Sequence, residues 1–272
     1  MILKHHLQQK LLNGQLIYGT CITSTAPLWP SVVGKSGVDF VFIDTEHIPL
    51  GRAELARLCQ SFRAFGVAPI VRIPAPDPYQ ACQVIDGGAI GVVAPYLESV
   101  EQVQALVGAT KYRPLKGERL QRILQGKEDL NPEVKAYIEK YNEGNLCIAN
   151  IESVPAAERL DELLSVPGLD AVFIGPHDLS VSLELPEQYD HPDFEKVVKD
   201  IVHKTRKQGL SAGIHFSEGP ERQIRWMQEG INIIVHSFDQ ALFIQRLTHD
   251  LRVIKNAAGE TYRPSEDSNP SV

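Results

Sequence analysis

Short apolar runs alternate along the chain with longer stretches in which apolar residues recur every three or four positions. The short runs are rich in β-branched residues, which is typical of buried strands, whereas the longer period is that of amphipathic helices. The short runs predict eight strands, over residues 16–23, 40–44, 68–74, 91–97, 145–152, 169–175, 210–216 and 231–237. The longer stretches predict helices between them, for example over 51–66, 99–111 and 191–209.

This alternation predicts an α/β fold, a (βα)8 TIM barrel in a single domain. The strands are apolar almost throughout, as expected of a parallel sheet that is covered on both faces. A doubly wound sheet is the alternative, but no GxGxxG or GxxxxGK[ST] motif follows the first strand. We expect the barrel domain to span residues 1–258, and we expect the polar tail 259–272 to be disordered.

An insertion interrupts the pattern at about residues 112–144, which are too polar for one helix. It predicts a basic loop followed by a separate helix from about Asn131. The loop has five basic residues within twelve positions, Lys111, Arg113, Lys116, Arg119 and Arg122. Such charges usually face solvent, but a loop of this length can also cover a site or recognise an acidic acceptor.

Composition restricts the class of function. The 272 residues carry a net charge of −7, which argues against a nucleic-acid-binding surface. The N-terminus lacks the features of a secretory signal, and no apolar run approaches the roughly 20 residues that a membrane-spanning helix needs. We therefore predict a cytoplasmic protein that acts on small molecules, with neither nucleic acid nor membrane as a partner.

The cysteines are dispersed and form no CxxC pair. They are Cys21, Cys59, Cys82 and Cys147. This spacing predicts buried free thiols rather than a zinc site or a disulfide framework.

Ionisable residues follow the predicted strands at the ends that would meet at the mouth of the barrel. The stretch FVFIDTEH (40–47) ends in Asp44, Glu46 and His47. The later strand ends contribute Arg72, Glu152, Asp178, His215 and His236. Active sites of TIM barrels lie at this face, so the pattern predicts an enzyme with its site there.

Each of these residues admits a chemical and a structural interpretation. Glu152 and Asp178 could hold one Mg²⁺ or Mn²⁺ ion, although an aspartate after a strand is often a helix cap. Asp44 could orient His47 as a proton carrier, or both could anchor a loop. Arg72 cannot lose its charge, so it needs a carboxylate or an anionic substrate beside it.

The stretch GPHD begins a predicted helix at Gly175. The backbone N–H groups of His177 and Asp178 would form an anion site suited to a substrate carboxylate. A 2-keto acid bound there, with Arg72 near its keto oxygen, would have its enolate stabilised by positive charge.

Several separated motifs in this order resemble those of the HpcH/HpaI aldolase family over about residues 10–255. They are DTEH (44–47), VRIP (71–74), DGGA (86–89), IES (151–153) and GPHDLS (175–180). The family comprises metal-dependent class II pyruvate aldolases, such as 2,4-dihydroxyhept-2-ene-1,7-dioate aldolase and 2-dehydro-3-deoxyglucarate aldolase.

The resemblance implies a role for each matching residue. Glu152 and Asp178 would bind Mg²⁺, Mn²⁺ or Co²⁺, Arg72 would contact the pyruvate oxygen, and His47 paired with Asp44 would be the acid/base. Gly175, His177, Asp178 and Asn150 would bind the substrate, while Asp86 would support the site without contacting the metal. We expect Glu46 either to contact a metal ligand or only to anchor the loop. The family assembles as a hexamer with exchanged C-terminal helices, and the helical stretch 239–258 is compatible with such a homo-oligomer.

Three departures from the family pattern leave the metal and pyruvate half of the predicted site intact and change the loop that would shape the pocket for the second substrate. The chain reads GERLQRILQGKED from Gly117 in place of a GVG segment, Asn150 replaces glutamine, and His177 replaces a small residue. The resemblance implies an aldolase that cleaves or forms a 4-hydroxy-2-keto acid through a pyruvate enolate, with an aldehyde or an acidic acceptor as partner. The alternatives are a siderophore-type citrate synthase that joins oxaloacetate to acetyl-CoA, and a non-catalytic keto-acid-binding protein.

Overall fold

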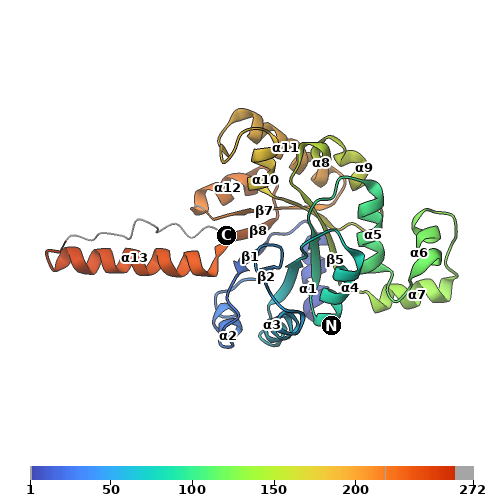
Figure 1. Cartoon of the computed structure of the whole chain (residues 1–272), viewed down its shortest axis with the longest axis horizontal. Helices are drawn as coiled ribbons and strands as arrows, with labels where there is room; N and C mark the ends of the chain where they lie inside the picture. Colours follow the sequence, from blue (N-terminus) through green and yellow to red (C-terminus); the bar gives the residue numbers. More distant parts are fainter. Residues whose placement is uncertain (1, 218, 261–272) are drawn as a thin grey trace.

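The computed structural model describes residues 2–217 and 219–260. Eight parallel strands follow one another in chain order and close into a barrel, so the predicted TIM barrel is confirmed (Figure 1). The strands are β1 (Ile17–Ile22), β2 (Phe40–Asp44), β3 (Ala68–Arg72), β4 (Gly91–Ala94), β5 (Leu146–Ile151), β6 (Ala171–Ile174), β7 (Ser211–Phe216) and β8 (Ile233–Phe238).

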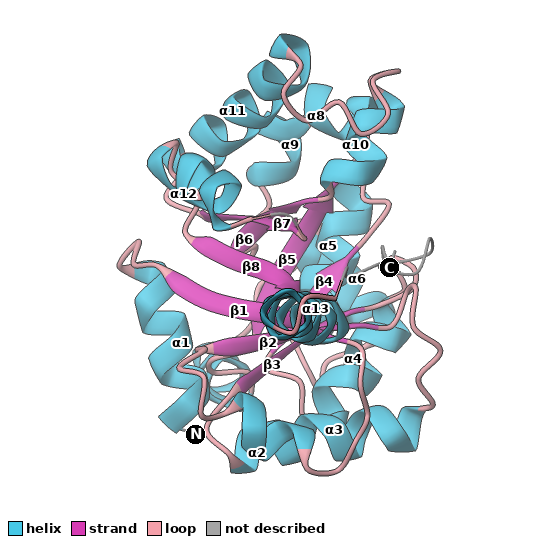
Figure 2. Cartoon of the chain, turned by 90° about the vertical axis from the view of Figure 1, so that its left-hand side faces the viewer, coloured by secondary structure: helices cyan, strands magenta, loops and turns pink. Residues whose placement is uncertain are grey.

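Helices surround the barrel on its outer side, as Figure 2 shows. The helices up to the fifth strand are α1 (Ile2–Leu12), α2 (Trp29–Val33), α3 (Arg52–Ala64), α4 (Pro78–Gly87), α5 (Val100–Lys111), α6 (Gly117–Leu124) and α7 (Pro132–Tyr141). Those after it are α8 (Val154–Glu158), α9 (Leu160–Leu164), α10 (Pro176–Ser182), α11 (Pro192–Lys207), α12 (Pro220–Gln228) and α13 (Asp239–Ala257).

The predicted strands all exist, and their bounds differ from the prediction by three residues or fewer. The largest difference is in β4, which ends at Ala94 rather than at residue 97. Pro95 follows directly and offers no N–H to the sheet, and Tyr96 has a positive φ of 56°. The backbone therefore turns away from the sheet at this point.

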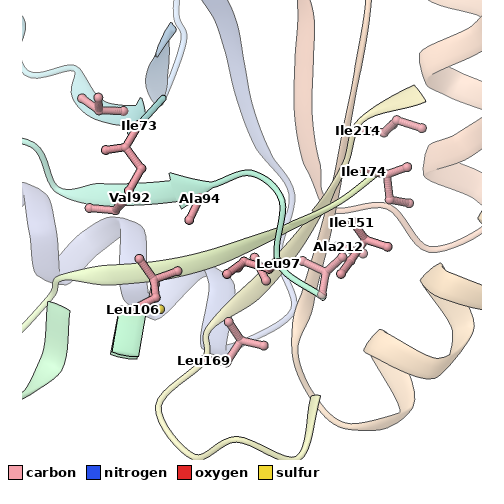
Figure 3. Packing of buried hydrophobic residues seen from close by; sticks show 14 of the residues in the cluster. Ile73, Val92, Ala94, Leu97, Leu106, Ile151, Leu169, Ile174, Ala212 and Ile214 are labelled. Carbon is pink, nitrogen blue, oxygen red and sulfur yellow. The ribbon is translucent and has the colours of Figure 1, made fainter. Parts of the chain in front are cut away.

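Two apolar cores hold the barrel together. One lies between the strands and the helices and includes Ile73, Val92 and Ile151 (Figure 3). The other fills the inside of the barrel, where the rings of Phe42 and Phe173 stack with centroids 5.3 Å apart. Large rings fit there because other inward positions are glycines; a Cβ on Gly213 would come within 2.6 Å of the Phe173 ring.

The N-terminal helix α1 closes the end of the barrel where the strands begin. Its residues Leu7 and Leu11 are buried in the inner core, and the Leu11 carbonyl accepts a hydrogen bond from the Ser211 hydroxyl at the start of β7. The sequence did not predict this helix, because MILKHHLQQKLL shows little regular alternation of apolar and polar residues.

The insertion and the last helix lie at opposite ends of the molecule. Helices α6 and α7 connect α5 to the beginning of β5, so they belong to the end where strands start, whereas α13 follows β8 and extends away from the other end (Figure 1). The helix expected from about Asn131 is α7, but the preceding basic segment contains helix α6 where a loop was expected. The predicted disorder of the tail concerns residues 261–272, which lie outside the described residues.

Candidate active site

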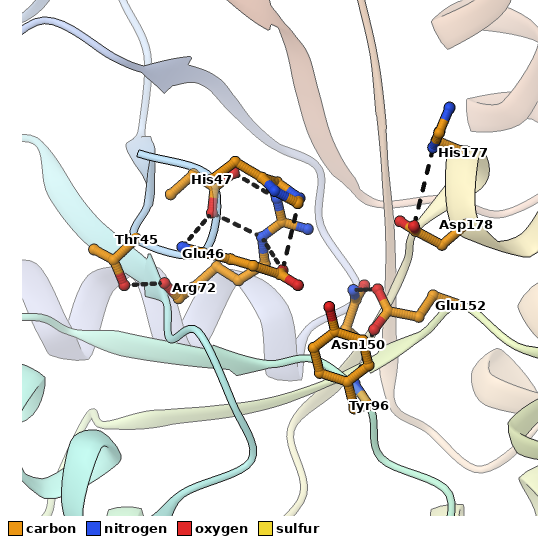
Figure 4. A network of polar contacts seen from close by, with 10 residues as sticks. Thr45, Glu46, His47, Arg72, Tyr96, Asn150, Glu152, His177 and Asp178 are labelled. Atoms are coloured by element: carbon orange, nitrogen blue, oxygen red, sulfur yellow. Dashed lines mark hydrogen bonds and ion pairs between the residues drawn. The ribbon is translucent and has the colours of Figure 1, made fainter. Parts of the chain in front are cut away.

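The strand ends bring the predicted residues together at the mouth of the barrel. Asp44 ends β2 and lies beside Arg72, which ends β3. Asn150 and Glu152 lie at the end of β5, and Gly175 directly follows β6. Figure 4 shows that the side chains from these strand ends gather around one region.

Arg72 is held by two carboxylates on one side of this region. Its Nε donates to Asp44 Oδ1 at 3.0 Å, its Nη2 donates to Asp44 Oδ2, and Nε also lies 3.2 Å from Glu46 Oε2. Burial by itself would raise the pKa of Asp44, but the hydrogen bonds and charge of Arg72 outweigh it and lower this pKa. The predicted anionic partner of Arg72 is thus Asp44, and both groups remain charged.

No hydrogen bond joins His47 to Asp44 among the described residues, although His47 lies near enough to contribute to the lowered pKa of Asp44. The two carboxylate oxygens of Asp44 are occupied by Arg72, and Oδ1 also accepts from the backbone N–H of Glu46 at 3.0 Å. The Nε2 atom of His47 lies 3.9 Å from Glu46 Oε2 instead, and the side chain is 48% exposed. Glu46 therefore faces both Arg72 and His47, and it is the carboxylate closest to the proposed proton carrier.

Glu152 is buried on the other side of the mouth. Its Oε1 accepts the backbone N–H of Tyr96 at 2.8 Å, and its Oε2 accepts from the side-chain amide of Asn150. The pKa of Glu152 is raised to about 7, first by burial and then by the nearby carboxylates of Asp178 and Glu46. Asn150 thus contacts the predicted metal ligand directly.

Tyr96 is a residue of this site that the sequence did not indicate. Its positive φ aims its backbone N–H at Glu152, and its hydroxyl forms a hydrogen bond with Glu46 that raises the pKa of Tyr96 to about 12. Tyr96 therefore bridges the two halves of the mouth. The only sequence signal was a tyrosine directly after a proline at the end of a predicted strand.

The segment after β6 supplies the remaining predicted residues. Asp178 lies in the first turn of α10 and is 55% exposed, with its Oδ1 3.9 Å from Nδ1 of His177. The Nε2 of His177 lies 3.7 Å from Glu187 Oε1. Gly175 is required here, because a Cβ at this position would come within 2.9 Å of the Glu152 Cβ.

The donor set at the mouth fits a divalent cation. The charge of Asp178 contributes to the raised pKa of Glu152, and a bound cation would remove that repulsion. Oε2 of Glu46 is a further buried carboxylate oxygen at the mouth, and it has no hydrogen-bond partner among the described residues. Those residues contain no ready-made group of three His, Cys, Asp or Glu side chains for a metal, so water or substrate oxygens would complete the coordination.

Asp86 lies away from the mouth of the barrel in its own chain. It lies near the C-terminal end of α4 and forms an ion pair with Arg113, which follows α5. The insertion lies at that same end, and three more of its basic residues are also paired, Lys111 with Asp170 and both Arg119 and Arg122 with Glu128. The basic segment therefore does not shape the mouth of its own chain, because it connects a helix to the start of a strand.

The cysteines behave as predicted. They are free thiols, three of them buried and Cys82 partly so. Within residues 2–217 and 219–260, none of the helices has the length and apolarity that a membrane span requires.

The fold and the site together define a class of protein, a TIM-barrel enzyme with paired carboxylates and an arginine at the mouth. The model of the HpcH/HpaI aldolase/citrate lyase family matches residues 19–246, and the chain belongs to this family.

Two of the similar proteins are named as aldolases. The chain is 29% identical to the 2-keto-3-deoxy-L-rhamnonate aldolase of Klebsiella pneumoniae, over 95% of this chain and 96% of the relative. It is 28% identical to the enzyme of the same name from Escherichia coli K12, over 94% and 95%.

Solved structures extend the comparison to a synthase. The chain is similar to an HpcH/HpaI aldolase from Desulfitobacterium hafniense DCB-2, with a TM-score of 0.79, 26% identity and coverage of 97% of this chain and 99% of the other. It is equally similar in fold to the citrate synthase SbnG, with a TM-score of 0.79, 31% identity and coverage of 93% and 99%. Membership of the family is thus established, while its members differ in the reaction named for them.

Proposed function

We propose that this protein is a divalent-metal-dependent aldolase that cleaves or forms the bond between C3 and C4 of a 4-hydroxy-2-keto acid through a pyruvate enolate. The observation that carries this proposal is the placement of Arg72 on two carboxylates, within electrostatic reach of Glu152. An arginine fixed in this way offers positive charge where an enolate oxygen develops negative charge, without reorganising during the reaction.

The 2-keto acid would be oriented by its two oxygen-bearing ends. The N–H groups at the start of α10, at His177 and Asp178, would receive its carboxylate. Arg72 would donate to the keto oxygen from the opposite side. Glu152 and Asp178 would hold Mg²⁺, Mn²⁺ or Co²⁺, which when bound supplies Lewis-acid stabilisation of the enolate oxygen.

His47 would move the proton on the second substrate. In cleavage it removes the proton of the C4 hydroxyl, the C3–C4 bond breaks to release the aldehyde, and the electron pair remains on the pyruvate enolate. Protonation of the enolate at C3 gives pyruvate. The carboxylate of Glu46 faces the ring during this step, with its Oε2 3.9 Å from Nε2.

Exchange of the pyruvate methyl protons for deuterium tests the enolate step without any aldehyde. We expect exchange, followed by proton NMR, with at least one of Mg²⁺, Mn²⁺ and Co²⁺ and none with chelator. Absence of exchange with every metal would contradict the proposed enolate. Thermal stabilisation by pyruvate with metal, combined with no exchange and no turnover, would favour a keto-acid-binding protein instead.

A condensing enzyme is the second candidate, because the citrate synthase SbnG is 31% identical over most of this chain. The same arginine and carboxylates would then hold oxaloacetate while an acetyl donor is added. Mass spectrometry of a mixture of the protein, metal, oxaloacetate and acetyl-CoA distinguishes the two, since only the synthase forms citrate.

The proposed enzyme is a homo-oligomer joined through α13. This helix has 19 residues, of which only Asp239 and Ala241 are buried within the chain. Its exposed apolar residues include Phe243, Val253 and Ile254. A second copy would cover these side chains, and exchange of α13 between subunits would provide that cover.

A further inference from the structure

Three positive side chains lie at the end of the barrel opposite the mouth, and the proposed reaction does not use them. Lys4 belongs to α1, Arg63 to the last turn of α3, and Arg113 follows α5. Helix α1 closes this end of the barrel, and the other two residues lie where the chain returns from a helix to the start of a strand. Segments far apart in the sequence therefore bring three cations to one end of the molecule.

Hydrogen bonds attach Lys4 and Arg113 to the same turn before β5. The Nζ atom of Lys4 donates to Asn145 Oδ1 at 2.6 Å. The amide of Asn142, three residues earlier, donates to the backbone carbonyl of Arg113 at 2.7 Å. The two asparagine side chains also contact each other, with Asn145 Nδ2 3.4 Å from Asn142 Oδ1. This turn fixes the position of one cation relative to the other.

Arg63 reaches the same place from α3. Its Nη1 lies 3.5 Å from the carbonyl oxygen of Gly88, two residues after Asp86, which forms the ion pair with Arg113. Burial and then the charges of Arg63 and Arg113 lower the pKa of Lys4 to about 8. The three cations are thus within electrostatic reach of one another, and each disfavours the charge of the next.

This cluster is short of negative charge. Arg113 is 9% exposed and has Asp86 as its partner, but neither Lys4 nor Arg63 has an ion pair with a carboxylate in the part of the chain that the structure describes. Glu143, which adjoins the turn before β5, lies 3.7 Å from a histidine of α1 instead. Lys4 and Arg63 are both partly buried, so water replaces the missing anion only in part. A bound anion would remove the repulsion among the three cations.

We propose that Lys4, Arg63 and Arg113 form a binding site for a phosphate group, at the end of the barrel opposite the active site. A phosphate group carries about two negative charges and at least three acceptor oxygens, so donors from three segments can contact it together. Guanidinium groups match its geometry with two parallel hydrogen bonds, and a lysine adds a point charge. A carboxylate offers only two oxygens and one charge. Since the cluster exists only in the folded chain, phosphate would also stabilise the fold.

Isothermal titration calorimetry with inorganic phosphate at constant ionic strength tests the site. Lys4→Gln and Arg63→Gln each remove one charge from a partly buried position. Lys10→Gln is the matched control, because Lys10 belongs to the same helix but is paired with Asp39 at 2.5 Å. We expect Kd to rise about tenfold in each of the first two variants and to stay within about twofold of the wild type in the control, as is typical of hydrogen bonds to charged groups. Glycerol 3-phosphate in the same titration distinguishes a phosphate monoester from free phosphate as the preferred ligand.

Chemical acetylation of Lys4 gives a second readout. At pH 8 a large part of its amino groups is neutral and reactive, and bound phosphate would favour the unreactive ammonium form. With N-hydroxysuccinimide acetate and mass spectrometry of the peptides, we expect phosphate to slow the modification of Lys4 but not of Lys10. This protection should be lost in Arg63→Gln.

Two results would overturn the proposal. One is the absence of saturable phosphate binding by the wild type. The other is an equal affinity in the wild type, Lys4→Gln and Arg63→Gln, which would place the phosphate elsewhere, for example at the start of α10. Pyruvate with metal should not displace phosphate, because its proposed site is at the mouth, and displacement would count against the proposal too. Thermal unfolding of each variant without phosphate confirms that the barrel is intact before affinities are compared.

Discussion

At the scale of single residues, the candidate site depends most on the positive charge of Arg72. Its partner Asp44 is only 2% exposed, so this carboxylate has almost no water to replace a lost arginine. The same guanidinium lies over Phe42, which also supports His215. The polar mouth is therefore attached directly to the aromatic layer of the inner core.

Replacing Arg72 tests this dependence. We expect Arg72→Ala to lower kcat by about 10²–10³-fold, as is typical when one donor to a developing oxyanion is lost. We also expect a decrease of about 3 kcal/mol in the free energy of unfolding, because Asp44 would stay buried without its partner. Arg72→Lys retains the positive charge but loses the bidentate contact with Asp44, so its kcat and its free energy of unfolding should lie between those of the wild type and Arg72→Ala. Steady-state kinetics and urea unfolding measure the two effects, and wild-type turnover in Arg72→Ala would exclude Arg72 from the reaction.

The low pKa of His215 gives stability a defined dependence on pH. In the folded protein this pKa is about 4, whereas the ordinary value of 6.5 applies to the unfolded chain. Between these two pH values the unfolded chain binds more protons at His215 than the folded protein does. The contribution of His215 to the free energy of unfolding therefore decreases as the pH falls from 6.5 to 4. Since the ring is partly exposed, we expect a loss of about 1.5 kcal/mol between pH 7.5 and pH 5.0.

Comparison with His215→Asn isolates this contribution, because asparagine does not titrate. Urea unfolding of both proteins at the two pH values should show that the variant loses about 1.5 kcal/mol less than the wild type. Equal losses would mean that His215 titrates normally in the folded protein.

The sequence predicted most of the residues at the mouth but not their pairing. Positions after strands are readable from apolar runs, so Arg72, Glu152 and Asp178 could be assigned to one end of the barrel. The pairing of Arg72 depends on the register of β2 and β3, which places Asp44 beside Arg72, while Glu46 lies near both Arg72 and His47. The role of Tyr96 depends on a backbone conformation that L residues rarely adopt, and no residue pattern announces it.

At the scale of elements, α1 shows how a weakly patterned segment can matter. It contributes Leu7 and Leu11 to the inner core and closes the end of the barrel opposite the mouth. Its stability comes from this burial rather than from its own amphipathicity. The strands were predictable because they are apolar throughout, whereas α1 could be recognised only from its tertiary contacts.

Adjacent leucines provide a matched test of this role. Leu11 is 4% exposed and Leu12 is 65% exposed. We expect Leu11→Ala to lower the free energy of unfolding by about 2–4 kcal/mol, and Leu12→Ala to change it by less than about 0.5 kcal/mol. Urea unfolding measures both. A similar small effect in the two variants would mean that α1 is not part of the cooperative core.

At the scale of the whole molecule, two features leave the barrel in opposite directions, α6 and α7 at one end and α13 at the other (Figure 1). The basic insertion cannot reach the mouth of its own chain, so any contact between it and a substrate would require a second copy. The barrel itself was predictable from the eight strands that alternate with helices. The arrangement of subunits in an oligomer could not be predicted from a single sequence.

Helix α13 allows the proposed oligomeric assembly to be tested. A 19-residue helix with two buried residues has little to stabilise it in an isolated chain, so we expect it to be packed in an oligomer. Phe243 and Ile254 are each 62% exposed, and changing both to glutamate would bury two charges in such an interface. Light scattering after size exclusion should show the wild type at a multiple of 30.2 kDa and the double variant at the monomer mass. Gln245→Glu, a charge added at an exposed polar position of the same helix, should remain oligomeric. A wild-type protein that is monomeric at all concentrations would contradict the proposed assembly. The active site of each barrel would then be formed by the residues of one chain alone.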